Sequence, residues 1–515
     1  MSALVNDCLR QSIACTIRLA GLIASGRQHL RILTFRWNQK RLKRKYAIYP
    51  DTPILPYCPQ VERSIRNAAR KRGPNTRFAT TSGSTGKPKE ILYTRRRLLA
   101  LKLNFSDMFA RACFAFRIKR TSLYVFSSFE TDTSLTSLLL DETEFPNYLS
   151  TLQAPYRVQH HLAIRALVET YGAVAVRLWL LTVSNPGVLY STNPSTISTF
   201  LDELARDWPR SSRLIKDWCN NPASFSPAVH KIFRRLESRG CTKRLKQIAL
   251  SDGPVSLSHC APAVNAYICW TGGYVQLFLD RLAIHLPSTR YTLIPMYSMS
   301  TESIETLPYF RDGEIAFLPI APGVVYEFMN DAGNLLDVDQ LEPGQLYEMV
   351  ISDAYGLRRY QTDDLFLCKR KTRNLPDLSF VRRRTLEYSF TGEKLTAVQL
   401  SVVFEQLRAR YPALLANRFL TCVPAQPPHY KVLLIGDSHS INRDEIATCC
   451  DALLSEINCE YRSKRTSGRL GSVEVVSMSL QDFAAMNPTW ETQYKFLPLI
   501  RECPHLISPS RVHVS

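Results

Sequence analysis

The segment TTSGSTGKPKE, residues 80–90, decides how this chain is interpreted. It holds two glycines, five hydroxyl residues and two lysines among eleven positions. Glycines let the backbone approach phosphate oxygens, hydroxyls donate hydrogen bonds, and lysines neutralise negative charge. A surface turn would account for the glycines and Pro88, but it gives no reason for the hydroxyls and lysines. We therefore predict that the segment binds the phosphates of a nucleotide.

The segment is not a kinase-like phosphate loop. In the pattern GxxxxGK[ST], a glycine stands five positions before the second glycine, and Ser or Thr follows the lysine. Counting back from Gly86, that position is Thr81, and Lys87 is followed by Pro88. The nucleotide would thus be held by a different kind of loop.

The flanking sequence predicts a mixed α/β chain. Apolar spacing predicts helices over 8–46 and near 60–72, and a helix that starts with Asn193 capping Pro194. The run ILYT, 91–94, predicts a strand directly after the loop, and further strands are expected within 315–329 and 346–352. Alternating helices and short strands favour an α/β or α+β architecture.

The composition is typical of a folded globular protein. The chain has 515 residues, 45% of them hydrophobic, which suffices for two domains or for one large domain with an appendage. Its fourteen cysteines show no CxxC pair or zinc-like spacing, so we interpret them as reduced thiols in a cytoplasmic protein. The apolar stretch near Leu19 is short and interrupted by Arg18, so we expect no membrane span and no secretory signal.

The positive charge is concentrated near the N-terminus. Residues 1–97 hold 21 lysines and arginines against 4 acidic residues, so they carry 17 of the 20 net positive charges. The densest run is RWNQKRLKRKY, 36–46. It is either the solvated face of an N-terminal helix or a surface that attracts nucleic acid or anionic lipid. The absence of an aromatic stacking platform favours the first interpretation and makes a nucleic-acid partner the less favoured one.

The order of residues in the loop adds specificity, because TTSGSTGKPK closely resembles the first core motif of the adenylate-forming superfamily. Later segments, in the same order, resemble the Gretchen Hagen family of auxin-responsive acyl-acid amido synthetases and their bacterial relatives. These segments are QHLRIL (28–33), WTGGYVQLFLDRL (270–282), YSMSTES (297–303), VVYEF (324–328), GQLYEMVISDAYGLRRYQTDD (344–364), FVRRRTLEYSFTGEKL (380–395), NCEYRSKRTSGRL (458–470) and TQYKFLP (492–498).

The resemblance implies a fold, a reaction and a domain division. The fold would be that of the adenylate-forming (firefly luciferase-like) enzymes: a large N-terminal domain of β-sheets flanked by helices, and a small mobile C-terminal α+β domain. Residues 1–384 would bind ATP and the acyl acid, with the basic helical segment at 8–46, and residues 385–515 would form the cap. The reaction would join a carboxylic acid to an amine, as in amino acid conjugation, with ATP and Mg²⁺.

The resemblance also assigns roles to individual residues. Glu302 would be the magnesium ligand, a task that suits a hard oxygen donor. Asp364 would accept hydrogen bonds from the ribose hydroxyls, and Lys495 would reach the reacting groups when the cap closes. The other expected nucleotide-binding residues are Ser82, Gly83, Ser84, Thr85, Gly86, Lys87, Lys89, Ser300, Thr301 and the hinge arginine Arg383.

The chain departs from the family pattern at three positions. Tyr297 stands one position earlier than the family's adenine-contacting tyrosine. In GLRRYQTDD, Arg358 replaces a tyrosine and Asp363 replaces a glycine, which adds a second negative charge beside Asp364. These changes keep an altered or lost activity open.

Three other functions share part of the sequence pattern of an amide-forming ligase. HHLAIRA, 160–166, lacks the aspartate and glycine of the condensing acyltransferases, so His160 and His161 are interpreted as helix-surface residues. A thioester-forming ligase would share the loop and Glu302 but transfer the acyl group to coenzyme A or a carrier protein. A degenerate synthetase would act as a nucleotide- or anion-binding interaction protein. The sequence does not identify the acid, the amine or the oligomeric state.

Overall fold

The computed structural model describes the chain in two compact units. Its described residues are 2–73, 76–80, 89–127, 129, 135, 138, 159, 161–311, 313–384, 387–388, 395–414, 418–422, 429–436, 442–466, 470–486 and 499–500. Those of the first unit lie within 1–81, 89–362 and 366–379, and those of the second within 363–365 and 380–515. The domain boundary that we placed after residue 384 stays a prediction.

The N-terminal region is helical, as predicted. Helix α1 (Ser2–Leu33) is followed, after Thr34, by α2 (Phe35–Lys45), and α3 (Pro59–Arg70) follows a proline-rich passage. Strands β1 (Thr76–Thr80) and β2 (Glu90–Thr94) pair antiparallel on either side of the glycine-rich loop, and α4 (Arg95–Ala115) begins directly after β2. The predicted strand after the loop is therefore confirmed.

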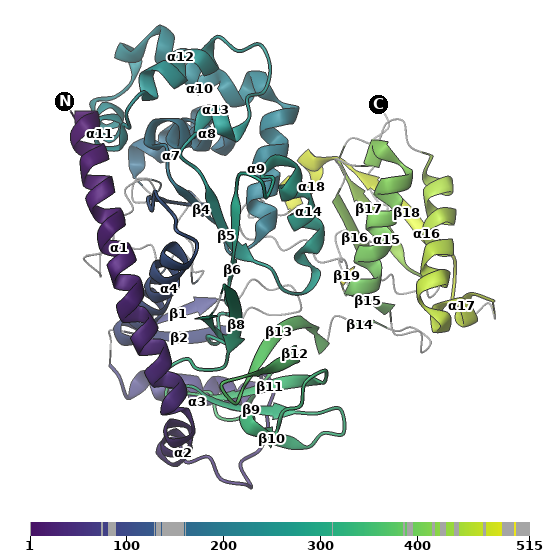
Figure 1. The fold of residues 1–515 in the computed structure, drawn as a ribbon. Helices are drawn as coiled ribbons and strands as arrows, with labels where there is room; N and C mark the ends of the chain where they lie inside the picture. The colour runs from purple at the N-terminus through teal and green to yellow at the C-terminus, as the bar shows by residue number, and fades with distance from the viewer. Residues whose placement is uncertain are drawn as a thin grey trace. The chain divides into compact units, whose positions relative to one another are not determined.

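Helix α1 packs closely along α4 (Figure 1). Gly21 permits the close approach, because a Cβ atom there would lie 2.7 Å from the carbonyl oxygen of Ala110 on α4. Further along the same face, Arg27 Nε donates to Asp107 Oδ2 at 3.0 Å and Arg31 donates to Asn104 at 2.9 Å. Apolar contact and polar links together fix α1 along its inner side.

A four-stranded parallel sheet forms the centre of the first unit. The strand order is β3 (Leu123–Val125), β4 (Val188–Tyr190), β5 (Ala266–Trp270), β6 (Thr292–Met296). Parallel strands are usually covered on both faces and are apolar along their whole length, as the buried run of β5 shows. Among the described residues, the helices between β3 and β6 are α7 (Leu162–Tyr171), α8 (Ala173–Ser184), α9 (Pro194–Arg206), α10 (Trp208–Asn220), α11 (Pro227–Leu236), α12 (Cys241–Ala249), α13 (Leu257–Cys260) and α14 (Gln276–His285), with the short 3₁₀ turns η2 (Pro222–Ser224) and η3 (Gly273–Val275). Their buried side chains share one hydrophobic core with the sheet.

Two antiparallel sheets complete the first unit and lead into the second. Strands β7 (Leu307–Arg311) and β8 (Glu314–Leu318) form a hairpin. The five-stranded sheet has the order β10 (Leu335–Asp337), β9 (Val325–Met329), β11 (Leu346–Ser352), β12 (Tyr360–Thr372), β13 (Leu375–Arg383), with η4 (Val338–Gln340) after β10. The strands predicted within 315–329 and 346–352 are confirmed.

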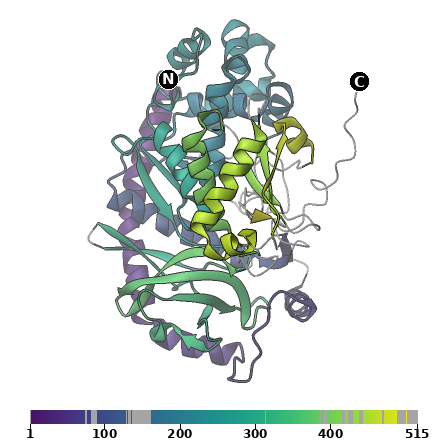
Figure 2. The ribbon, with the colours of Figure 1, turned by 90° about the vertical axis from the view of Figure 1, so that its right-hand side faces the viewer.

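The second unit is an α+β fold. Its four-stranded sheet has the order β18 (Glu474–Met478), β17 (Lys431–Ile435), β16 (Arg418–Cys422), β19 (Leu499–Ile500). Helices α15 (Ala397–Arg410) and α16 (Arg443–Ile457) lie side by side (Figure 2). The remaining elements are the ribbon β14 (Glu387–Tyr388) and β15 (Leu395–Thr396), the turn η6 (Pro412–Leu414), α17 (Cys459–Thr466) and α18 (Leu480–Met486).

Candidate active site

Three side chains from distant parts of the sequence meet beside the end of the glycine-rich loop. Lys89 directly precedes β2, Glu302 follows β6, and Tyr360 is the first residue of β12. Lys89 Nζ lies 3.1 Å from Glu302 Oε1 and 2.9 Å from the Tyr360 hydroxyl, which itself lies 3.3 Å from the same carboxylate oxygen. The Glu302 side chain is almost completely buried. We call these three residues the Lys89 cluster.

Aromatic rings surround the Lys89 ammonium group. Lys89 Nζ lies 5.8 Å from the ring centre of Tyr57 and 5.6 Å from that of Tyr360. The Tyr57 hydroxyl also accepts a hydrogen bond of 3.1 Å from the backbone N–H of Glu90. Aromatic faces attract a cation, so the two rings and the Glu302 carboxylate together orient the Lys89 ammonium group. Neither tyrosine was predicted from the sequence. Tyr360 stands in the GLRRYQTDD motif, whereas no motif surrounds Tyr57.

A buried arginine holds the backbone on which Glu302 stands. Arg97, in the first turn of α4, donates to the carbonyl oxygen of Glu302, donates to that of Leu92 at 2.7 Å, and pairs with Asp353 at 3.3 Å. Its guanidinium carbon lies 4.6 Å from the ring centres of both Tyr93 and Tyr355. Because a guanidinium offers five donors in a plane, one side chain can serve all these partners. Arg97 is therefore a positioning residue that the sequence analysis missed.

Burial affects the titration of the groups around Arg97. It raises the pKa of the Asp353 carboxyl, although the charge of Arg97 opposes that shift. It also raises the pKa of Tyr93 to about 12. The Tyr93 hydroxyl therefore keeps its proton and donates it to the carbonyl oxygen of Thr301 at 2.8 Å. The Thr301–Glu302 backbone is thus held by two donors from the β2–α4 segment.

Ser300 and Thr301 lie in the turn that carries Glu302. The N–H of Ser300 donates to the carbonyl oxygen of Ser303 at 2.9 Å, and the side chains of Ser300 and Thr301 are both half-buried. Tyr297, by contrast, is buried, and burial raises its pKa. Its ring packs in the interior. Tyr297, which stands one position earlier than the family's adenine-contacting tyrosine, is therefore a core residue in this structure.

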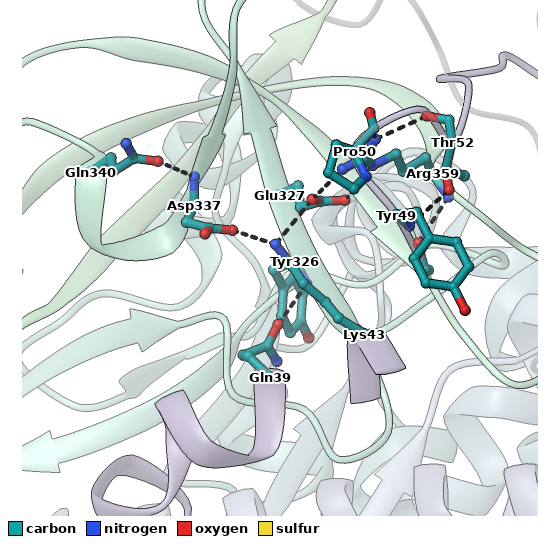
Figure 3. Close-up of polar contacts among 11 residues, drawn as sticks. Gln39, Lys43, Tyr49, Pro50, Thr52, Tyr326, Glu327, Asp337, Gln340 and Arg359 are labelled. Carbon is teal, nitrogen blue, oxygen red and sulfur yellow. Dashed lines mark hydrogen bonds and ion pairs between the residues drawn. The ribbon is translucent and has the colours of Figure 1, made fainter. Parts of the chain in front are cut away.

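Polar contacts hold Arg359, the residue that directly precedes β12 (Figure 3). Arg359 donates to both carboxylate oxygens of Glu327 on β9, at 3.0 and 3.1 Å. It also donates to the carbonyl oxygens of Pro50 and Thr52, each at 2.9 Å. On the other side of Glu327, Lys43 of α2 approaches the same carboxylate at 3.0 Å. The bidentate geometry fixes the direction of Arg359 and, with it, the neighbouring Tyr360.

In the second unit, two predicted residues contact each other. Arg383 Nε lies 3.1 Å from Asp364 Oδ1, and the Asp364 side chain is nearly fully buried. The preceding residue, Asp363, has a φ of 68°. Glycine adopts such angles at no steric cost, whereas most other residues do not. The position where the family pattern has glycine is therefore one where the backbone favours it.

Several predicted site residues lie outside the described part of the chain. They are Ser82, Gly83, Ser84, Thr85, Gly86 and Lys87 of the loop, and Lys495 near the C-terminus. His160 is also outside it. His161 is exposed, and its Nδ1 accepts from the N–H of Ala163 at 3.1 Å, so it caps α7.

The residues near Glu302 fit magnesium only if a nucleotide supplies further ligands. Among the described residues, no three His, Cys, Asp or Glu side chains gather into a metal site. Glu302 offers one buried carboxylate, against which Lys89 already places a positive charge. Magnesium commonly takes one or two protein carboxylates and completes its shell with phosphate and water. The donor set therefore suits a magnesium ion that arrives with a nucleotide.

Comparisons with solved structures identify the fold. An acyl acid amido synthetase solved in complex with 2,4-DB superposes with a TM-score of 0.65 and 17% sequence identity, covering 88% of this chain and 86% of that one. A second structure, titled GH3.15 acyl acid amido synthetase, superposes with a TM-score of 0.64 and 18% identity, covering 87% and 84%. The chain thus shares its fold with these acyl acid amido synthetases, and the fold class predicted from the sequence is confirmed.

Sequence comparisons show similarity to the GH3 family over part of the chain. The model of the GH3 family central domain matches residues 317–383, and that of the GH3 family C-terminal domain matches residues 399–502. Indole-3-acetic acid-amido synthetase GH3.8 of Oryza sativa subsp. indica is 26% identical over 39% of this chain and 36% of its own length. The probable synthetase GH3.9 of Oryza sativa subsp. japonica is 26% identical over 39% of this chain and 53% of its own length. The matches therefore span between about a third and half of these relatives, and the resemblance to the GH3 family is confirmed.

Proposed function

We propose that the protein is an ATP-dependent, AMP-forming ligase that adenylates a carboxylic acid and transfers the acyl group to an amine. The observation that carries the proposal is the Lys89 cluster. In this cluster Lys89, at the end of the predicted phosphate-binding loop, forms an ion pair with the buried carboxylate of Glu302. The two residues stand in two separate motifs that resemble those of one enzyme family. The GH3 domain models and the fold support the same reaction.

The first half-reaction forms an acyl-adenylate. A carboxylate oxygen of the acid attacks the α-phosphorus of ATP, and the bond to the leaving pyrophosphate breaks. Negative charge moves to the pyrophosphate, so we assign Lys87, Lys89 and the loop hydroxyls to the β- and γ-phosphates. We assign Glu302 to magnesium, which when bound neutralises charge on the phosphate oxygens. Tyr360 and Arg97 would keep Lys89 and Glu302 in place.

The second half-reaction forms the amide. The nitrogen of an amine attacks the acyl carbon, the bond to the AMP oxygen breaks, and the nitrogen loses a proton to solvent. The relatives are named indole-3-acetic acid-amido synthetases, which supports an amide product, and we assign an amino acid as the amine. Since a mixed anhydride reacts with water, we assign residues 385–515 to a cap that closes over it, with Lys495 directed to the reacting groups. Asp364 would bind the ribose and Arg383 would mark the hinge.

Exchange of labelled pyrophosphate into ATP tests the first half-reaction. The assay uses a panel of aromatic, fatty and keto acids with the intact chain. We expect exchange that requires one class of acid and is lost in Lys87→Ala and in Glu302→Gln. Lys231→Ala, an exposed lysine on α11, is the matched control and should exchange normally. No exchange across the panel while ATP still binds would favour the degenerate synthetase.

Product mass separates the amide from the thioester. The acid that supports exchange is incubated with a mixture of amino acids and, separately, with coenzyme A. An amide product supports the proposal, and a thioester without amide would assign the chain to the acyl-CoA ligases instead.

A further inference from the structure

The outer face of the two N-terminal helices carries a continuous row of exposed apolar side chains. These are Leu19, Leu22, Ile23, Leu30, Leu33 and Trp37, each between 52% and 70% exposed. Their spacing repeats every three, four or seven residues, so they share one side of the helical path. The row extends over about 27 Å at 1.5 Å per residue. We call these six residues the outer stripe.

The exposure of the outer stripe is not caused by a loose helix. The opposite side of α1 is buried at Ile17, Ala24 and Ile32, and it packs on α4. The polar links from Arg27 and Arg31 to α4 fix it further. Figure 1 shows α1 (purple) along the edge of the first unit, with its far side turned away from α4. A contiguous row of large exposed apolar side chains is typical of a surface that binds a protein or a membrane.

Cations extend the outer stripe along the same face. Lys40, Arg41 and Arg44 follow Trp37 by three, four and seven residues, and all three are exposed. The guanidinium carbon of Arg41 lies 4.9 Å from the ring centre of Trp37, so charge and apolar surface are directly adjacent. The face therefore combines an apolar row with a basic end, and the sequence analysis identified only the basic end.

The combination of charge and apolar surface selects among possible occupants. A second copy of the chain would bring like charges near one another, because residues 1–97 hold 21 basic against 4 acidic residues. A nucleic acid would use the cations but would leave the apolar row in water. An anionic lipid surface uses both, since headgroups attract Lys and Arg while Leu and Trp side chains enter the interface. We propose that this face docks the protein on an anionic lipid surface.

The docking would be peripheral. Among the described residues, no helix is long and apolar enough to cross a membrane. Each Lys or Arg near an anionic surface contributes about 1 kcal/mol, which is about fivefold in affinity. The apolar row adds to this attraction in proportion to the surface that it buries in the interface. The two contributions can be removed separately, because they lie on different residues.

Vesicle co-sedimentation of the intact chain tests the proposal. The vesicles consist of phosphatidylcholine alone or of phosphatidylcholine mixed with phosphatidylserine. We expect binding to the mixed vesicles only, decreasing as salt rises. The triple variant Lys40→Gln, Arg41→Gln, Arg44→Gln should bind on the order of 100-fold more weakly. Leu30→Ser, Leu33→Ser, Trp37→Ser should bind weaker by roughly tenfold or more.

Matched variants control for charge and exposed apolar surface in general. Arg239→Gln, Lys243→Gln, Lys246→Gln removes three exposed cations near and on α12, and Leu162→Ser, Leu250→Ser, Ile284→Ser removes three exposed apolar side chains elsewhere. Both controls should bind vesicles as the parent does. Without vesicles, all four variants should support pyrophosphate exchange like the parent, so that lipid docking and catalysis are tested independently.

Three results would overturn the proposal. The first is no binding of the parent to the mixed vesicles at low salt, or equal binding to neutral ones. The second is that the charge variant loses vesicle binding while the apolar variant binds like the parent, and that the parent binds double-stranded DNA more tightly than it binds vesicles. This result would indicate a nucleic-acid surface. The third is concentration-dependent self-association that the apolar variant abolishes, without vesicle binding, which would indicate a second copy.

Discussion

Replacing Arg97 with methionine tests whether the support behind Glu302 matters for both stability and activity. The substitution removes the cation that pairs with Asp353, a buried carboxylate that would keep the N–H donors of Tyr355, at 2.7 Å, and Leu357, at 3.2 Å. The charge of Arg72 also acts on this carboxylate, but less than that of Arg97. Breaking a buried pair by removing one partner costs about 3–5 kcal/mol. For a unit of this size, that corresponds to a fall in melting temperature on the order of 5 °C.

The loss of stability should depend on pH in a definite direction. Burial raises the pKa of Asp353 above its ordinary value, and Arg97 lowers it. The folded state therefore binds the proton more tightly than the unfolded state, so this group stabilises less as the pH rises from the ordinary carboxyl range through the folded pKa. Removing Arg97 raises the folded pKa further. The difference between parent and variant should hence be smaller at pH 5 than at pH 8.

Calorimetric melting at both pH values, with pyrophosphate exchange below the transition, measures the two effects. Asp353→Asn in the Arg97→Met background should restore part of the lost stability, because it removes the uncompensated charge. It should not restore exchange, since the Glu302 carbonyl still lacks its donor. Arg96→Met, at the exposed neighbouring arginine, should change stability by less than about 0.5 kcal/mol. An equal loss of stability at the two pH values, or additive effects of the two substitutions, would refute this account of the pair.

Three further substitutions have expected outcomes. Tyr360→Phe removes the hydroxyl shared within the Lys89 cluster; exchange should fall by about tenfold, with a change in unfolding free energy of about 1 kcal/mol. Gly356→Ala would place a Cβ 2.6 Å from the Cα of Ile65 at a φ of 109°; thermal melting should show a loss above about 2 kcal/mol. Asp363→Gly should be more stable than Asp363→Ala by about 1 kcal/mol, because φ there is positive; if the extra carboxylate weakens nucleotide binding, the glycine variant should also show a lower KM for ATP.

Local patterns predicted some of the helices and strands, because these elements follow from residue spacing and from capping residues. The predicted helix over 8–46 exists as α1 and α2, with one interruption at Thr34, and the helix after Asn193 begins at Pro194. His161 was interpreted as a surface residue of a helix; it is exposed, but its ring nitrogen caps α7. The capping role of His161 depends on the residue at which the helix starts. The spacing of apolar residues defines that start only approximately.

The site was predictable only in part, because its geometry depends on contacts between distant residues. Glu302 and Lys89 were each assigned from a motif, but their ion pair joins positions 213 residues apart. Arg97 stands in a run of three arginines, Arg95–Arg97, and nothing in that run distinguishes the buried one from its two exposed neighbours. Burial is set by tertiary packing, so the residue that holds the site could not be found from charge alone.

The two departures from the family pattern in the GLRRYQTDD motif have different structural consequences. Arg358, where the family has tyrosine, donates to the carbonyl oxygen of Ala47, two residues after α2, so the replacement gains a structural partner. Asp363 has a positive φ angle, which glycine adopts more easily than aspartate does. It also adds a carboxylate next to Asp364. A residue that is kept at a steric cost is more informative than one that is accommodated, because strain persists where the surroundings or the function require it. Under the proposed function, Asp363→Gly is therefore the substitution in this motif that we expect to change nucleotide binding.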